Sequence, residues 1–157
     1  MSGVDCFIRG THILTQDGEC RVEDLTEGQL VLTTKGEYKP VTWIGRRLIQ
    51  LDGLSEEDRR ALLPVVIQRG AISENVPHRD LYVSLNHGIG LGEYWAAAGW
   101  LLNGETICHC TGVSEFEYFH IDCGSHEMVY AEGLTVETYV DMGNRRSFDN
   151  AEEFYAR

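Results

Sequence analysis

The chain has 157 residues, and its 25 acidic residues against 13 Lys and Arg give a formal net charge of −12. A chain of this length buries roughly 70% of its surface on folding, enough for one ordinary core, so two large independent domains are not expected. The negative charge repels polyphosphate and anionic lipid headgroups, which argues against nucleic acid as a partner. The longest apolar run, Tyr94 to Leu102, has nine residues, well short of the roughly 20 that a membrane-spanning helix needs.

The five cysteines, at positions 6, 20, 108, 110 and 123, form an odd and irregularly spaced set. This pattern resembles free thiols more than a disulfide framework, and it favours a reducing compartment. No charged leader followed by an apolar segment opens the sequence. We therefore expect a soluble protein without a membrane span, which folds in the cytoplasm or is exported as part of a larger precursor.

Short hydrophobic runs, interrupted about every ten residues by Gly, Asp, Asn or Pro, predict an all-β domain built from many brief strands. Turns such as Gln16-Asp17-Gly18 provide glycine where a hairpin needs a positive φ. Eleven strands are predicted: Cys6–Ile8, Ile13–Thr15, Cys20–Arg21, Leu30–Thr33, Tyr38–Ile49, Val65–Ile67, Leu81–Val83, Glu93–Ala97, Glu105–Cys110, Phe116–Cys123 and Met128–Ala131.

Three short segments favour helix instead of strand. Ser55 can serve as an N-cap, acidic and then basic residues follow it, and Pro64 ends the pattern, which predicts a helix of about two turns. Val22–Leu25 fits a single turn, and the segment Phe148–Tyr155 is weakly helical in character. None of these segments carries obvious chemistry.

Three residue types that carry chemistry are found near strand ends. Cys6 lies at the start of the first predicted strand, and a lone cysteine is more often an inert core residue than a nucleophile. Ser84 and His87, however, stand three residues apart just after the predicted strand Leu81–Val83. A thiol, a hydroxyl and an imidazole brought together can carry out acyl transfer.

Five stretches of the chain resemble, in order, the sequence blocks of a known family. They are Cys6-Phe-Ile-Arg-Gly-Thr-His-Ile-Leu-Thr, Val22-Glu-Asp-Leu-Thr-Glu-Gly-Gln-Leu-Val-Leu-Thr, Pro40-Val-Thr-Trp-Ile-Gly-Arg-Arg, Pro77-His-Arg-Asp-Leu-Tyr-Val-Ser-Leu-Asn-His and His126-Glu-Met-Val-Tyr-Ala-Glu-Gly-Leu-Thr-Val-Glu-Thr-Tyr. The chain thus resembles the Hint domain of hedgehog autoprocessing domains and inteins, specifically its bacterial hedgehog/intein branch. The resemblance implies an all-β Hint fold over residues 6–148, after an extein-like stub or tag remnant at 1–5 and before a C-terminal tail at 149–157.

The resemblance also implies a self-cleaving reaction in which the Cys6 thiol attacks the carbonyl of Asp5 and converts that peptide bond to a thioester. An amide is stabilised by resonance and its nitrogen leaves badly, so the site must distort the bond and protonate the nitrogen. We assign that proton to His87, because imidazole donates and accepts near neutral pH. Ser84 stands where the family usually has threonine. Its hydroxyl would bond the scissile amide or help hold the oxyanion, a contribution of about 3 kcal/mol.

Three further residues are second-rank candidates. Asp80, four residues before Ser84, would take the proton from Cys6 or orient His87. The alternative is that Asp80 only binds Arg79 or the backbone where the strand begins. His126 holds the histidine position of the closing block and would assist, although a packed structural histidine is the commoner role; His120 receives less weight.

The closing block lacks what protein splicing needs. Splicing inteins end it with His, Asn and a nucleophile, whereas the matching positions here are Glu137, Thr138 and Tyr139. Threonine has no amide nitrogen with which to cyclise, so cleavage without splicing is expected. The residues after 148 are too few for a sterol-recognition region, so water, a small thiol or amine, or a neighbouring protein's amine would take the acyl group. The substrate is then the chain's own upstream polypeptide, in a single-turnover autoproteolysis that needs no metal and no other cofactor.

Two alternatives from other functional classes remain. A zinc-binding module would draw its ligands from the thiols and imidazoles of Cys108, His109, Cys110, Cys123 and His126. Cys-x-Cys on a strand, however, lacks the spacing of a zinc knuckle. A catalytically silent Hint-fold binding module would use Trp43, Trp95 and Trp100 as interface anchors, although aromatic residues are more often core.

Overall fold

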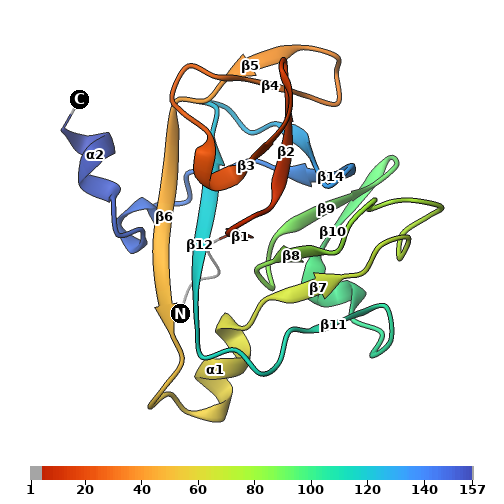
Figure 1. Cartoon of the computed structure of the whole chain (residues 1–157). Helices are drawn as coiled ribbons and strands as arrows, with labels where there is room; N and C mark the ends of the chain where they lie inside the picture. Colours follow the sequence, from red (N-terminus) through yellow and green to blue (C-terminus); the bar gives the residue numbers. More distant parts are fainter. Residues whose placement is uncertain (1–4, 157) are drawn as a thin grey trace.

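The computed structural model describes residues 5–156, in which fourteen strands form two antiparallel sheets (Figure 1). The long pair β6 and β12 lies along one side of the molecule, with the short strand β1 beside β12 (Figure 1). The six-stranded sheet has the order β11 (Ile107–His109), β7 (Val65–Ile67), β8 (Leu81–Val83), β1 (Phe7–Ile8), β12 (Glu115–Asp122) and β6 (Trp43–Gln50).

The second sheet is a curved set of eight strands that packs over the first. Its order is β10 (Tyr94–Ala97), β9 (Gly88–Leu91), β14 (Leu134–Glu137), β13 (Met128–Ala131), β2 (His12–Thr15), β4 (Leu30–Leu32) and β5 (Tyr38–Pro40), and β3 (Gly18–Arg21) also pairs with β2. Buried apolar residues from both sheets form one core, among them Phe7, Ile13, Val83 and Val136. The all-β prediction is therefore confirmed.

The register of β1 positions the candidate site. Phe7 is fully buried and pairs with Phe119 of β12 on one side and Val83 of β8 on the other. Because apolar residues fix this register, the residue before β1 comes to lie between the end of β8 and the middle of β12. That residue is Cys6.

Most predicted strands are found within a residue or two of their expected ends, and one differs in kind. The predicted strand Tyr38–Ile49 is two strands, β5 in the eight-stranded sheet and β6 in the six-stranded sheet. Pro40 is the last residue of β5, and β6 begins at Trp43 in the other sheet, so the chain crosses between the sheets over Val41 and Thr42.

Two strands, β9 and β14, are missing from the prediction. β9 contains Gly88 and Gly90, and glycine weakens a strand on propensity grounds. Both glycines are needed because β14 packs against them: a Cβ on Gly88 would lie 2.7 Å from the carboxyl carbon of Glu137, and one on Gly90 would lie 2.7 Å from Thr135 Cγ2.

The predicted helical segments are confirmed as short elements. Helix α1 (Glu56–Leu62) begins at Ser55, whose side chain accepts a hydrogen bond from the Asp58 N–H. The single turn is η1 (Val22–Asp24), and α2 (Ala151–Tyr155) lies within the predicted segment Phe148–Tyr155. The structure adds two short turns that the sequence pattern does not predict, η2 (Ala98–Leu101) and η3 (Arg145–Ser147). No helix in the described part of the chain is long and apolar enough to cross a membrane.

The segment expected as a C-terminal tail packs against the outer edge of β6 (Figure 1). The Asp149 N–H donates to the Arg46 carbonyl, and Asn150 Oδ1 accepts from the Arg46 N–H at 2.7 Å. These contacts cover backbone groups on an edge strand that would otherwise be free to pair with another chain. Residues 1–4 of the predicted upstream stub, and residue 157, lie outside the described residues.

Candidate functional site

The peptide bond between Asp5 and Cys6 is held on its nitrogen side by Ser84. The Cys6 N–H donates to Ser84 Oγ at 2.8 Å, and the Ser84 N–H donates to the Cys6 carbonyl at 2.9 Å. Both residues are buried. Of the two roles considered for the Ser84 hydroxyl, contact with the scissile amide is the one that this geometry favours.

His87 is completely buried on the other side of Cys6, with a ring nitrogen against each of two carbonyl oxygens. Nδ1 lies 3.1 Å from the Cys6 oxygen and Nε2 lies 2.9 Å from the Glu137 oxygen. A neutral imidazole has one donor nitrogen and can satisfy only one of these acceptors, whereas the imidazolium satisfies both. Burial lowers the pKa of His87, and the Glu137 charge and the two carbonyls act in the opposite direction. The ring is therefore arranged to hold a proton and to give it up readily.

The loop from Ser84 to His87 is fixed by its own backbone and by η2. The His87 N–H donates to the Ser84 carbonyl, and the Ala98 N–H donates to the His87 carbonyl at 2.9 Å. Gly99 donates to the Leu85 carbonyl at 2.8 Å, an approach so close that a Cβ on Gly99 would lie 2.7 Å from the Leu85 side chain. The hydroxyl and the imidazole are thus held by main-chain contacts.

The Cys6 sulfur lies in an apolar environment. The side chain is 1% exposed in a cluster that includes Trp43, Tyr118 and Tyr139. Burial, with the Asp5 charge adding to it, raises the pKa of the thiol well above its usual value. Within residues 5–156, the sulfur makes no hydrogen bond with Ser84 or His87; it is the Cys6 backbone that these two residues hold.

His120 is the imidazole on the strand next to Cys6. Phe7 pairs with Phe119, so the antiparallel register continued by one residue sets Cys6 opposite His120, and directly opposed side chains have Cβ atoms about 4.5–5.5 Å apart. The His120 ring is fully buried, with its centroid 5.2 Å from that of His87, and among the described residues neither of its nitrogens has a hydrogen-bond partner. Burial, with His87 and His126 adding to it, holds its pKa well below the usual value, so the ring is neutral.

A carboxyl pair flanks the Asp5–Cys6 peptide bond on its upstream side. The side chain of Asp5 is hydrogen-bonded to that of Glu137. Burial, together with this hydrogen bond and the charge of Glu137, raises the pKa of Asp5 to about 9. Burial also acts to raise the pKa of Glu137, but its contacts with Asp5 and His87 outweigh burial and lower it. At neutral pH the pair therefore consists of a neutral Asp5 and an ionised Glu137.

Glu137 connects this pair to the rest of the site. Its Oε1 accepts from the Gly88 N–H at 2.8 Å, and its Oε2 lies 3.0 Å from His126 Nε2. The missing side chain of Gly88 leaves the space that the carboxylate fills. In the sequence, position 137 stands out only because it lacks the histidine of splicing inteins. The contacts of Glu137 with His126 and Gly88 depend on the pairing of β14 with β9, two strands that the sequence pattern does not predict.

Asp80 is not at the reacting bond. Its carboxylate accepts a hydrogen bond from the Arg69 N–H at 2.9 Å and is exposed. It lies before β8, four residues and about 13 Å of extended chain from Ser84. The observed contact fits the alternative role given for Asp80, a backbone partner where the strand begins.

The soft ligands of the zinc alternative are spread over the molecule. Cys108 is on β11 and Cys110 follows that strand, whereas Cys123 follows β12. Four strand spacings, about 19 Å, separate β11 from β12 in the sheet. These residues therefore cannot close one tetrahedral site. Of the tryptophans in the binding-module alternative, Trp43 is buried, and Trp95 and Trp100 are exposed.

The carboxyl pair makes stability depend on pH. Asp5 ionises near its ordinary value of 3.8 when unfolded but near 9 when folded, so between these values the folded chain binds more protons and its stability falls as pH rises. Asp5→Asn keeps a neutral side chain, so its free energy of unfolding is expected to rise relative to that of the parent chain between about pH 5 and about pH 9. Urea denaturation of both chains measures this difference, and parallel pH profiles would contradict it.

Comparison with known proteins gives a consistent family and fold. A family model described as "Hint domain" matches residues 5–143. A DnaB intein from Synechocystis sp. PCC 6803 is similar with a TM-score of 0.58 and 11% identity, over 87% of this chain and 99% of that chain. A bacterial intein-like domain from Clostridium thermocellum is similar with a TM-score of 0.55 and 15% identity, over 86% and 98%. At these identities the structures show the fold alone. No curated protein sequence matches the chain significantly.

Proposed function

This chain belongs to the Hint domain family, whose members are self-processing domains, and we propose that it cleaves the bond between Asp5 and Cys6 through a thioester. The observation that carries the proposal is the scissile N–H held at 2.8 Å by Ser84 Oγ, with His87 Nδ1 on the carbonyl of the same residue. The departing segment ends at Asp5, and residues 6–148 form the processing domain.

The first step is an N-to-S acyl shift. The neutral ring of His120, which lies opposite Cys6 in the strand register, takes the thiol proton while the sulfur attacks, because burial raises the pKa of the thiol and disfavours a free thiolate. The sulfur attacks the Asp5 carbonyl carbon, the carbon–nitrogen bond breaks, and His87 gives its proton to the departing nitrogen. Ser84 keeps that nitrogen in place. His120 thus takes the proton-accepting role that the sequence predicts for Asp80.

Asp5 and Glu137 prepare this step without touching the thiol. A protonated Asp5 places no negative charge beside the carbonyl oxygen, where negative charge develops during attack. Glu137 is a positioning residue, because its backbone oxygen holds His87 Nε2 and its carboxylate holds the Gly88 N–H.

The second step transfers the acyl group to a small nucleophile. A hollow of about 420 Å³ adjoins the site and is lined in part by His126, Tyr139 and Arg145. His126 also contacts Glu137, which connects this hollow to the scissile bond. Water, a thiol or an amine fits this volume. The nucleophile attacks the thioester carbonyl and loses its proton to His87. The Cys6 sulfur leaves and regains its proton from His120.

Cleavage without splicing is supported by the position of Thr138. Its side chain is fully buried, accepting from the Glu127 N–H at 2.9 Å and donating to the Ser125 carbonyl. A hydroxyl held in this way has neither the nitrogen nor the freedom to cyclise onto its own carbonyl.

Incubation with dithiothreitol tests the proposal. A thiol intercepts a thioester, so the intact mass of the chain is expected to fall by the mass of residues 1–5, and a new N-terminus is expected at Cys6. A chain that stays folded and uncut over days, with a longer upstream segment attached, would contradict the proposal.

A further inference from the structure

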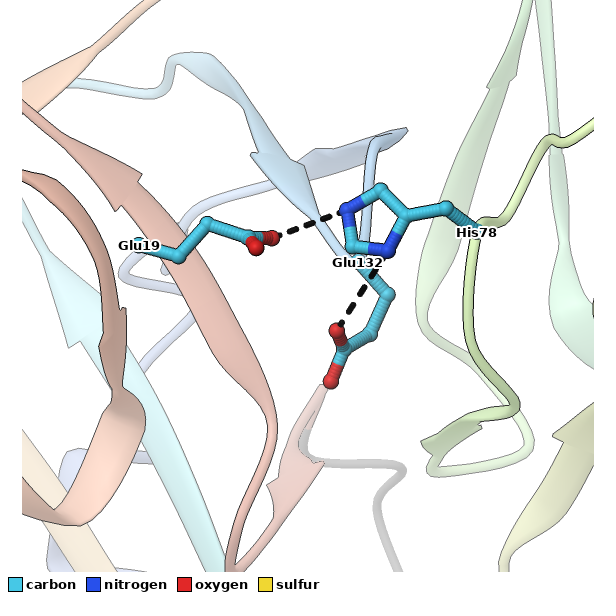
Figure 2. Close-up of side chains that lie close together, drawn as sticks. All are labelled: Glu19, His78 and Glu132. Carbon is cyan, nitrogen blue, oxygen red and sulfur yellow. Dashed lines mark ion pairs between the residues drawn. The ribbon is translucent and has the colours of Figure 1, made fainter.

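A second cluster of ionisable side chains lies away from the processing site, where Glu19, His78 and Glu132 approach one another (Figure 2). Glu19 Oε2 is 2.9 Å from His78 Nε2, and Glu132 Oε1 is 4.0 Å from His78 Nδ1. One donor atom from each residue can be chosen so that all three lie within 4.8 Å of one another. The set joins β3, the segment before β8 and the turn between β13 and β14.

Glu132 is the buried centre of this cluster. It is 3% exposed and has a φ of 49° in the hairpin turn that Gly133 completes. Glycine, asparagine and aspartate are favoured at such a turn position, so a glutamate there carries backbone strain. Its Oε2 accepts from the His12 N–H at 3.0 Å and lies 3.0 Å from His12 Nδ1, while its Oε1 lies on the side of His78 and Arg79. Hydrogen bonds of this kind orient a carboxylate that ligates a metal.

The imidazole of His78 is also held in place. Its Cδ2 would lie 2.6 Å from a Cβ on Gly133, so the ring packs directly over that glycine. The His78 N–H donates to the Glu132 carbonyl at 2.8 Å. The His78 ring and Glu132 are therefore held close together. Glu19 faces Nε2 and Glu132 faces Nδ1, so one carboxylate must shift towards the ring nitrogen that binds the ion.

A cation already occupies the space between the two carboxylates. Arg79 Nη1 lies 2.8 Å from Glu132 Oε1 and 3.6 Å from Glu19 Oε1. The Arg79 side chain is 52% exposed and can move out into solvent. One guanidinium neutralises only one of the two carboxylate charges, whereas a divalent ion neutralises both.

We propose that Glu19, His78 and Glu132 bind a divalent first-row transition ion, which displaces the Arg79 guanidinium. One imidazole nitrogen and two carboxylate oxygens suit zinc, cobalt, iron or manganese, with water completing the coordination. The ion would cross-link three segments that lead directly to the processing residues, because Ser84 follows His78 by six residues and Glu137 follows Glu132 by five. The site would thus stabilise the fold, and it is independent of whether the chain cleaves itself.

The test is a titration of the metal-free full chain with Co²⁺, followed by absorbance and by thermal unfolding. We expect one ion per chain, weak visible bands without the intense sulfur-to-cobalt charge-transfer band of a thiolate ligand, and a Tm higher by about 5–10 °C at hundredfold excess over Kd. Glu19→Gln, a change at a partly exposed side chain, is expected to weaken binding at least about tenfold. Glu117 pairs with Arg9 outside the cluster. Glu117→Gln is therefore the matched control, and it should bind Co²⁺ like the parent.

Arg79→Ala separates a metal site from an ion-pair network. If Arg79 competes with the ion, its removal tightens Co²⁺ binding by about threefold or more, since no bound cation has to be displaced. If the cluster is only an ion-pair network, the variant loses stability and gains no affinity. Loss of stability without a gain in affinity would overturn the proposal. So would a charge-transfer band, absence of Co²⁺ binding, or equal Co²⁺ affinity of Glu19→Gln and the parent.

Discussion

Cys6→Ala is expected to abolish cleavage between Asp5 and Cys6 while the fold is retained. The thiol is the nucleophile of the first step, and no thioester forms without it. Its loss removes one sulfur atom from an apolar cluster, a change of about 1 kcal/mol in the free energy of unfolding. The measurement is the intact mass of the chain during incubation with dithiothreitol, together with urea denaturation. Cys123→Ala, at another buried cysteine, is the matched control and should cleave at the parent rate.

Cleavage of Cys6→Ala at the parent rate would contradict the thioester mechanism. The neighbouring Asp5 carboxyl would then be the first group to consider, because a side-chain carboxyl can attack its own backbone carbonyl. Asp5→Ala in the Cys6→Ala background would distinguish the two, because alanine has no side-chain group that can attack the backbone carbonyl.

His87→Ala is expected to slow cleavage by about 10² to 10⁴, the usual range for a lost acid or base. The departing nitrogen then has no positioned proton, and the carbonyls of Cys6 and Glu137 lose their shared partner. Single-turnover rates from the mass of the chain over time measure the effect. His109→Ala, at a histidine outside the site, is the control, and a parent-like rate for His87→Ala would show that His87 does not protonate the nitrogen.

The other buried histidine should respond differently to pH. His120 is proposed as the base for the thiol, so the slow cleavage of His120→Asn should recover in part as pH rises and hydroxide deprotonates Cys6 directly. His87→Ala should not recover in this way, because a higher pH supplies no proton to the nitrogen. Identical pH profiles for the two variants would contradict this division of roles.

Local pattern predicts the strands of this fold well where apolar residues alternate, as in β7, β8 and β13. It fails for β9, because the glycines that lower its strand propensity are required by side chains of β14 that arrive much later in the chain. It fails also at Pro40, where the chain changes sheets. Both failures concern contacts between distant segments.

The same distinction applies to the site. The family's sequence blocks are enough to predict Cys6, Ser84 and His87 as site residues, and backbone contacts bring these three together in the structure. The place of His120 depends on the register of β1 against β12, and that of Glu137 on the neighbours of β14. Asp80 is predicted from its proximity along the chain, but an extended strand separates it from Ser84 and its carboxylate contacts the Arg69 N–H.

The central claim is a thioester between the Asp5 carbonyl and the Cys6 sulfur, and hydroxylamine trapping tests it most directly. Hydroxylamine attacks a thioester, so the released upstream peptide should carry a hydroxamate on the backbone carbonyl of Asp5, located by tandem mass spectrometry. The product should be absent from Cys6→Ala. A folded parent chain that yields no hydroxamate, or yields it at any other bond, would contradict the account.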